Sequence, residues 1–271
     1  MSGGFAPDLP SLLTLEQIDT NIFRGRNADY GRRLTLYGGQ VAAQSLLAAA
    51  ATVEPDRHPH SFHSYFLRAG RSDVPLILQV DRDRDGRSFS ARHVSAVQDG
   101  EVIFSMVCSF HREGDGSVFD GAPLRKVPGP DAAPVGGWNT LLDVREVTPT
   151  DFARGVLSDC LWVRSAVALG ERPLLQRAGL TYLSDLGTGF GQQGRELLGR
   201  GGPSIDHSMW FQEPVRSDDW VLVDLRPVKA RAGRGTYHGS MRDQEGRLGA
   251  TLYQEHLLTP GSPADNLESG G

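Results

Sequence analysis

Three polar side chains in the second half of the sequence stand among apolar neighbours and are of types that carry out chemistry. Asp185 falls at the end of a predicted helix, in the string LTYLSDL at 180–186. A carboxylate near a buried helix end is costly unless it is paired, and loss of hydration would raise its pKa. Ser204, at the start of a predicted strand, and Gln254, within the last one, add a hydroxyl and an amide. Taken singly, each also has a structural explanation, as a helix-end acid, a strand-start hydroxyl and an edge amide.

The familiar short motifs of catalysis do not account for these residues. The nucleophile elbow Gly-x-Ser-x-Gly is absent from the sequence. The string 206–208, Asp-His-Ser, has the letters of a triad, but adjacent side chains point in different directions and cannot form a relay. The string 189–194, GFGQQG, fits a dinucleotide fingerprint, yet it follows a helix end instead of a strand, so a glycine-rich loop is expected.

Metal and cofactor sites are also not expected. His58, His60 and His63 lie close together, but no His-Glu-x-x-His string accompanies them. The two cysteines, Cys108 and Cys160, are too far apart for a zinc pattern and too few for a disulfide framework.

Composition narrows the class of protein and of partner. The chain has 271 residues, 39% hydrophobic and 23% charged, which is typical of one or two globular domains with a real core. Its net charge of −5 argues against nucleic acid as a partner. The most apolar stretch, 41–53, is too short to span a bilayer, and the N-terminus lacks the pattern of a secretory signal, so a cytoplasmic location is expected. Nearly all basic residues are arginines, which fits either a compositional bias or phosphate binding.

The sequence contains an internal duplication. Four short strings recur in the same order at offsets of 144 to 147 residues, as expected of a tandem repeat. They pair 63–66 (HSYF) with 207–210 (HSMW), 86–87 with 233–234 (GR), 98–100 (QDG) with 244–246 (QEG), and His111 with His256.

Each half has the same predicted elements, which gives an α+β fold class. A helix that is apolar almost all round begins at Gly38-Gly39, and a helix with an apolar stripe covers Leu175 to Leu186. Three strands with Asp-Gly or Glu-Gly turns follow each helix and predict a curved antiparallel meander. The strands are expected at 75–84, 88–98 and 101–111, and at 220–226, 234–242 and 248–258.

The halves are expected to be joined by a linker. Prolines and glycines interrupt the chain after residue 112, which predicts an N-terminal unit at 12–112, a linker at 113–147 and a C-terminal unit at 148–259. The tail from Pro260 is expected to be loose.

Five strings closely resemble the type II acyl-CoA thioesterase family, and the similarity extends from about residue 15 to residue 258. The resemblance implies two hotdog units fused in one chain, each a curved sheet around a central helix, that hydrolyse acyl-CoA to free fatty acid and CoA. No cofactor or metal is implied. The strings are FRG at 23–25, GGQVAAQ at 38–44, HSFHSYFLR at 60–68, RSFSAR at 87–92 and IDHSMWF at 205–211.

The family's catalytic trio of Asp, Thr and Gln maps onto Asp185, Ser204 and Gln254. Ser204 departs from the usual threonine, so the hydroxyl is kept while the methyl that limits its rotation is lost. Asp185 would accept a proton from a water held by the other two residues. Because Ser109 stands where the repeat offset places the counterpart of Gln254, the first half is expected to have lost catalysis.

Substrate contacts are assigned on placement and composition. The amides of Gly38 and Gly39 are expected near the thioester carbonyl oxygen. The acyl chain is expected against Phe62, Phe66, Met209 and Trp210, and the CoA phosphates near Arg87, Arg92 or Arg234.

Two other functions remain open from the residues: a hotdog-fold enoyl-CoA hydratase, and a non-catalytic acyl-CoA binding protein. A homo-oligomer, dimeric or larger, is also expected.

Overall fold

The computed structural model describes residues 8–28, 35–112, 114, 116–122, 124–147, 159–187, 189–191 and 200–259. The predicted tail from Pro260 and residues 192–194 of the predicted glycine-rich loop lie outside these ranges. The first half contains α1 (Leu9–Leu12), β1 (Glu16–Asp19), β2 (Ile22–Gly25), α2 (Gly38–Ala50), β3 (Arg57–Phe66), β4 (Leu76–Asp85), β5 (Phe89–Gln98) and β6 (Glu101–Arg112). The second contains η1 (Pro130–Ala132), β7 (Val135–Gly136), β8 (Leu142–Glu146), β9 (Asp159–Ser165), α3 (Pro173–Leu183), β10 (Arg200–Ser204), β11 (Asp206–Phe211), β12 (Val221–Arg231), β13 (Arg234–Arg242) and β14 (Leu248–Thr259).

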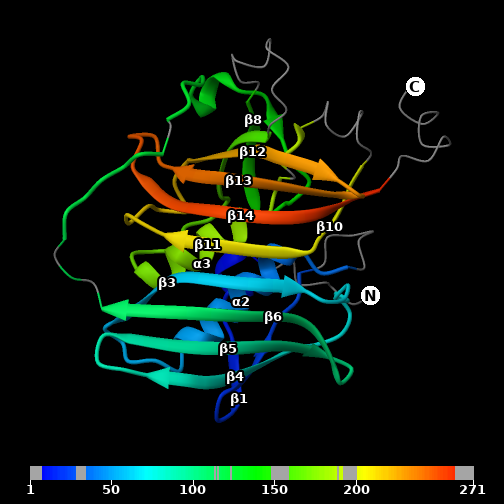
Figure 1. Cartoon of the computed structure of the whole chain (residues 1–271), viewed down its shortest axis with the longest axis vertical. Helices are drawn as coiled ribbons and strands as arrows, with labels where there is room; N and C mark the ends of the chain where they lie inside the picture. The colour runs from blue at the N-terminus through cyan, green and yellow to red at the C-terminus, as the bar shows by residue number, and fades with distance from the viewer. Residues whose placement is uncertain are drawn as a thin grey trace.

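The strands form one antiparallel sheet that is continuous across both halves. Its order is β1-β2-β4-β5-β6-β3-β11-β14-β13-β12-β9-β8-β7, with β10 paired to β14. Figure 1 shows the two halves meeting at β3 and β11, where Phe62 is paired with Met209. Outward from this junction, β3, β6, β5 and β4 on one side match β11, β14, β13 and β12 on the other. The duplicated strings therefore occupy equivalent strands and the turns between them.

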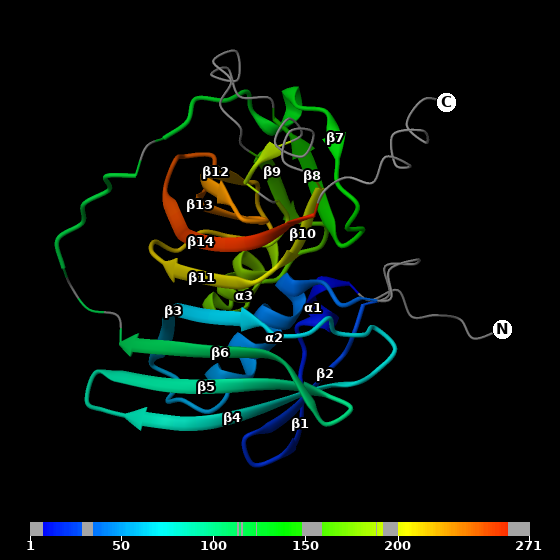
Figure 2. The same ribbon diagram turned by 45° about the vertical axis from the view of Figure 1, so that its right-hand side comes forward.

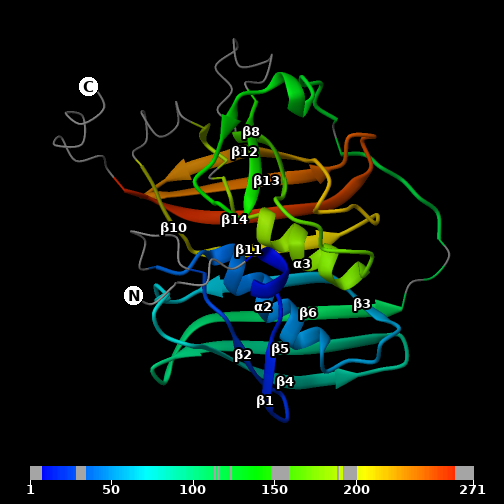
Figure 3. The same cartoon turned by 180° about the vertical axis from the view of Figure 1, so that it is seen from behind.

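Both long helices lie on one side of the sheet. In Figure 3, which views the molecule from behind, α2 and α3 lie in front of the strands, and the two helices contact each other. Figure 2 shows how the sheet curves around them. Helix α2 is rich in alanine and leucine, which favour helix, and nearly all its residues are buried. The amide nitrogen of its buried Gln44 donates to the main-chain oxygens of Leu12 (2.8 Å) and Arg26 (2.7 Å).

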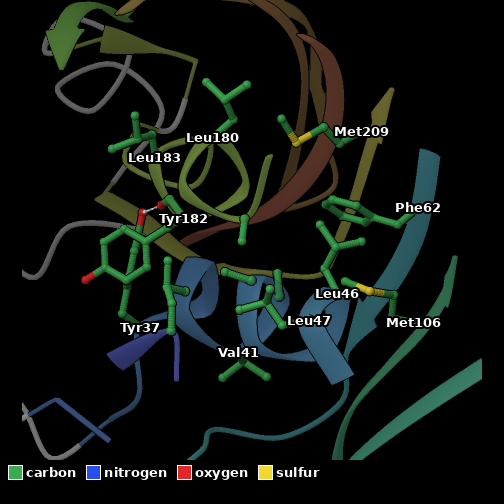
Figure 4. Packing of buried hydrophobic residues seen from close by; sticks show 14 of the residues in the cluster. Tyr37, Val41, Leu46, Leu47, Phe62, Met106, Leu180, Tyr182, Leu183 and Met209 are labelled. Atoms are coloured by element: carbon green, nitrogen blue, oxygen red, sulfur yellow. Dashed lines mark hydrogen bonds between the residues drawn. The ribbon is translucent and has the colours of Figure 1, made fainter. Parts of the chain in front are cut away.

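A single core joins the halves. Figure 4 shows buried side chains of both helices, which include Val41, Leu46 and Leu47 of α2 and Leu180 and Leu183 of α3. These residues are buried members of one apolar cluster that draws on both halves. Burial at about 25 cal/mol per Å² of apolar surface makes such a shared core the main force that holds the halves together.

The predicted elements are confirmed with small shifts at their ends. Helix α2 begins at Gly38 as expected, and the six strands of the meanders are β4–β6 and β12–β14. The turn between β5 and β6 places Asp99 and Gly100 at φ of 49° and 80°, the left-handed pair that a tight hairpin requires.

The linker prediction is wrong at its C-terminal end. Within residues 135–147, strands β7 and β8 pair with each other, and β8 also pairs with β9. The apolar residues Leu142 and Val144 alternate with more exposed ones along β8 and are buried, so this stretch belongs to the sheet despite the prolines that precede it.

Candidate active site

Asp185 follows the last turn of α3 and is held by partners from three other segments. Ser204, the last residue of β10, donates its hydroxyl to Asp185 Oδ1 at 3.2 Å. Gln254, in β14, donates its amide Nε2 to the same oxygen at 2.8 Å. The same amide lies 2.5 Å from Ser204 Oγ. The predicted carboxylate, hydroxyl and amide therefore converge on one point.

Local structure explains the convergence. β10 is antiparallel to β14, and Ser204 is opposite His256, two residues from Gln254. Gln254 is fully buried, so its side chain points to the face of the sheet that the helices cover. Leu180, Tyr182 and Leu183 are buried in the core, and they fix the end of α3 beside this part of the sheet.

The N-terminus of α2, from the first half, completes the site. The main-chain N–H of Gly39 hydrogen-bonds the Asp185 carboxylate. A Cβ on Gly38 would lie only 2.5 Å from Asp185 Oδ2 and 2.9 Å from the Phe66 ring, so the carboxylate lies directly against this glycine. The Tyr37 hydroxyl donates to the main-chain oxygen of Tyr182 at 2.8 Å and connects the two helix ends (Figure 4). A carboxylate at a helix N-terminus is favourably placed in the helix dipole.

Burial nevertheless makes Asp185 a weaker acid. Desolvation raises the pKa of Asp185 to about 6, against the opposing effect of hydrogen bonds from Gln254, Ser204 and Gly39. At neutral pH the group is mostly ionised and still basic enough to accept a proton, which is the property of a general base.

A pocket of about 780 Å³ opens onto this cluster. Asp185 and Ser204 form part of its wall together with Gly38, while Gln254 lies behind them. Its other lining is largely apolar and includes Val41, Phe66, Phe104, Trp138, Ile205 and Leu257. Among the described residues of the lining, Arg68 and Asp185 are the charged ones.

Known protein families match both halves of the chain. The model of the acyl-CoA thioesterase N-terminal domain matches residues 27–111, and that of the acyl-CoA thioesterase C-terminal domain matches residues 120–258. The chain belongs to the acyl-CoA thioesterase family.

Individual relatives agree with this assignment. The chain is 31% identical to human acyl-coenzyme A thioesterase 8, over 92% of its own length and 88% of the relative's. It is 33% identical to acyl-CoA thioesterase 2 of Haemophilus influenzae, over 93% and 96%. Among solved structures, acyl-CoA thioesterase II TesB2 of Mycobacterium marinum is 38% identical with a TM-score of 0.79, covering 94% of this chain and 99% of that one. A hotdog-fold protein from Alicyclobacillus acidocaldarius is 22% identical, also with a TM-score of 0.79, over 93% and 98%, and shows the fold alone. The chain is thus a hotdog-fold enzyme of the thioester hydrolase class.

Three of the four predicted acyl contacts of this thioesterase lie away from the pocket. Phe62 and Met209 face each other across the β3–β11 junction with no exposed surface, because they fill the core between sheet and helices (Figure 4). Trp210 points to the opposite face of the sheet, where its ring contacts His63 at 5.2 Å between centroids. Phe66 is the member of the predicted set that lines the pocket.

The predicted phosphate contacts also need correction. Arg92 is 1% exposed and caps the end of α2 by donating to Thr52 Oγ1 and O, at 2.8 and 2.9 Å, and to Asp85 at 2.8 Å. Arg87 lies in the β4–β5 hairpin, at the opposite end of the strands from Phe66 (Figure 1). Arg234 is paired with Glu255 at 3.1 Å, outside the pocket lining.

The role of the two glycines differs from the expectation too. The sequence predicts that both amides approach a thioester carbonyl, but the Gly39 amide is directed to the Asp185 carboxylate. Sequence reasoning also missed Arg68, although it ends the string HSFHSYFLR and comes directly after β3, two residues beyond Phe66.

The described residues contain neither a candidate metal cluster nor a candidate membrane-spanning helix. No group of three or more His, Cys, Asp or Glu side chains among them could hold a metal ion. None of the helices described is long and apolar enough to cross a bilayer.

Proposed function

We propose that this thioesterase is a tandem double hotdog that hydrolyses acyl-CoA to free fatty acid and CoA with a water activated by Asp185. The observation that supports this proposal is the convergence of Asp185, Ser204 and Gln254 on the wall of a largely apolar pocket. Asp185 and Ser204 lie in the wall of the cavity, and Gln254, distant from both in sequence, supports them from behind.

The reaction requires a base and a way to hold water. Asp185 takes a proton from the water, whose oxygen attacks the thioester carbonyl carbon. Oδ1 is already occupied by Ser204 and Gln254, so Oδ2, which faces Gly38 and Phe66, is the oxygen that accepts the proton. The tetrahedral intermediate collapses by breaking the C–S bond, and CoA leaves as a thiolate that is protonated afterwards. Because an alkyl thiol has a pKa of ~8.5, the leaving group needs little acid assistance.

The N-terminus of α2 would stabilise the tetrahedral intermediate. Its dipole favours the negative charge that develops on the carbonyl oxygen when that oxygen lies near Gly38. The acyl chain would follow the apolar lining from Phe66 toward Phe104 and Trp138.

The tandem architecture is supported by the matching strand order on both sides of the β3–β11 junction and by one long helix in each half. We place the N-terminal unit at 12–112, as predicted from the sequence. The C-terminal unit would begin near residue 135, because β7 and β8 extend its sheet.

The hydratase alternative finds less support. It needs an Asp and a His that flank one water, and the adjacent pair in this chain has separate partners. Asp206 accepts the main-chain N–H of Glu255 at 2.6 Å, whereas His207 Nε2 lies 2.8 Å from Ser184 Oγ.

Isotope labelling tests direct attack by water. In H₂¹⁸O, with enzyme in excess over acyl-CoA, the first turnover should release thiol and place one ¹⁸O in the fatty acid. Unlabelled acid in that turnover, with label appearing in Asp185, would mean that the carboxylate itself attacks. No thiol release from acyl-CoA of any chain length would refute hydrolysis.

The activity should rise with pH. Since Asp185 must be ionised to act as a base and its pKa is raised to about 6, kcat/KM should increase through that pH and level off above it. At pH 5 it should be about one tenth of the plateau. A pH profile of thiol release measures this, and a profile that is flat or falls between pH 5 and 7.5 would contradict the assignment.

Arg68 is expected to recognise the CoA phosphates. Arg68 lines the pocket, and its guanidinium pairs with Glu101 at 2.9 Å and donates to the Val102 oxygen at 2.7 Å. Arg68→Ala should raise KM for acyl-CoA by ~3- to 10-fold with little change in kcat. The KM for an acyl N-acetylcysteamine thioester, which has no phosphate, should not change.

The matched control is Arg112→Ala. Arg112 also forms one exposed ion pair, with Asp56 at 2.7 Å, but at the far end of β6. Equal KM changes in both variants, or an Arg68 effect that persists with the phosphate-free substrate, would remove Arg68 from phosphate recognition.

We also propose association with a further copy of the chain. The outer face of the central strands exposes Tyr65, Trp210 and Tyr253 at 58%, 38% and 42% of their surface, and aromatic residues are enriched at interfaces. Light scattering during gel filtration tests this, and a monomer at micromolar concentration would refute it.

A further inference from the structure

His207 is a buried histidine next to the catalytic cluster that the reaction as written does not use. It lies in β11 with no exposed surface, and its ring packs against Phe62 at 5.4 Å between centroids. Its Nε2 lies 2.8 Å from the hydroxyl of Ser184, the residue that immediately precedes Asp185. The imidazole therefore reaches the same chain segment as the carboxylate.

Two polar atoms behind the site are buried without a well-formed hydrogen bond. They are His207 Nδ1 and Gln254 Oε1. The other end of the Gln254 amide is fully used, since Nε2 donates to Asp185 and contacts Ser204. Buried polar atoms of this kind are rarely left unpaired, and here an acceptor and a ring nitrogen belong to neighbouring side chains.

The protonation of His207 decides whether the two atoms can pair. Burial lowers the pKa of His207 to about 4, and hydrogen bonding with the Gln254 side chain acts in the opposite direction. At neutral pH the ring is thus uncharged and has one N–H to place. With that proton on Nε2, Nδ1 and Gln254 Oε1 would be two acceptors facing each other in the interior. With the proton on Nδ1, both are satisfied, and Ser184 gives its one hydroxyl hydrogen to Nε2 in place of the Thr181 main-chain oxygen, which also lies 2.8 Å from Oγ.

We propose that His207 carries its proton on Nδ1, donates it to Gln254 Oε1, and in this way fixes the orientation of the amide that holds Asp185 and Ser204. His207 is then a positioning residue, and this inference rests on the proposed function. An amide turned by 180° would place Oε1 against the Asp185 carboxylate and lose both contacts of Nε2. The bond from His207 opposes that rotation, because the turned amide would present its NH₂ group to the Nδ1–H donor.

Two substitutions of His207 test the roles of its ring nitrogens Nδ1 and Nε2 separately. In His207→Asn the side-chain NH₂ can occupy the place of Nδ1, whereas in His207→Gln it reaches the place of Nε2 and serves Ser184 instead. We expect kcat of His207→Asn to stay within about threefold of the parent, and that of His207→Gln to fall by about tenfold or more, as misorientation of a water-holding group does. KM should be unchanged in both, because His207 does not line the pocket. Equal losses, or a larger loss in His207→Asn, would overturn the proposal.

Combining the substitutions with Gln254→Ala distinguishes this inference from the proposed function. If His207 acts through Gln254, His207→Gln should lower kcat no further in the Gln254→Ala background. Additive losses would overturn the positioning role and leave the proposed function intact. A Gln254→Ala variant with full kcat would instead refute the role of Gln254 in the reaction.

The tautomer can be observed without any substitution that disturbs folding. Nitrogen NMR of the parent enzyme with ¹⁵N-labelled histidine should show a neutral ring protonated at Nδ1, assigned to His207 by its loss in either variant. A His207 ring protonated at Nε2 would overturn the proposal whatever the kcat of the two variants.

Discussion

Asp185→Asn is expected to lower kcat for acyl-CoA hydrolysis by about 100- to 10,000-fold, the usual contribution of a general base. The one side-chain oxygen of asparagine can still accept from Gln254 and Ser204, so most of the cluster is retained while the base is lost. Initial rates of thiol release with a saturating substrate measure the effect.

The same Asp185→Asn substitution should preserve or raise the stability of the fold while it lowers the activity. The pKa of Asp185 is raised in the folded state to about 6 from 3.8, so ionisation of this group opposes folding. The penalty is absent below pH ~4 and complete above pH ~6, and asparagine removes it. At pH 7 the unfolding temperature of the variant should therefore equal or exceed that of the parent.

Asp206→Asn provides the control. Asp206 is a nearby, partly buried carboxylate that accepts the Glu255 N–H, which asparagine can also do, and it lies outside the pocket lining. Its kcat should be close to that of the parent. Near-normal turnover in Asp185→Asn, or equal losses in both variants, would exclude Asp185 as the base.

Gly38→Ala is expected to lower kcat by about 100-fold, the cost of displacing a reacting group by about 1 Å. The added Cβ would lie 2.5 Å from Asp185 Oδ2 and 2.9 Å from the Phe66 ring. Both contacts are with the ends of side chains, so the side chains move and the backbone does not. Because alanine favours helix more than glycine does, the unfolding temperature should not fall.

Gly129→Ala is the matched control, since a Cβ there would meet nothing within 4 Å. Its activity should equal that of the parent. A Gly38→Ala enzyme of normal kcat would show that the carboxylate does not need its position against the start of α2. Loss of activity together with early unfolding would mean that the substitution acts on the fold.

Local sequence signals were enough to predict the helices and strands. They could not predict the active site, because its assembly depends on pairing between segments that are distant in sequence. The start of α2 at Gly38 and the Asp99-Gly100 turn depend on neighbouring residues alone, and both are confirmed. The meeting of Asp185, Ser204 and Gln254 depends on β10 pairing with β14 and on α3 ending beside them. Residue types marked the three positions as unusual, but only the family resemblance connected them.

Several of the predicted substrate contacts are wrong for a similar reason. Phe62 and Met209 are apolar residues near the expected tunnel, yet their side chains point to a face of the sheet that is filled by the helices. Arg92 has the charge that a phosphate requires, but its guanidinium is already hydrogen-bonded to Thr52 at the end of α2. Neither the direction of a side chain nor its partners can be deduced from its type.

The duplicated halves differ at the start of their helices. Where α2 opens with Gly38, α3 opens with Pro173, which has no amide hydrogen to offer an anion. At the repeat counterparts of Ser204 and Gln254, His60 Nε2 lies 2.8 Å from Ser109 Oγ, and no carboxylate of the described residues is hydrogen-bonded to this pair. Under the proposed mechanism, each polypeptide therefore carries one reactive centre assembled from both copies of the repeat. Titration with a tight-binding substrate analogue would reach saturation at a stoichiometry of one ligand per chain, in whatever assembly the chains form.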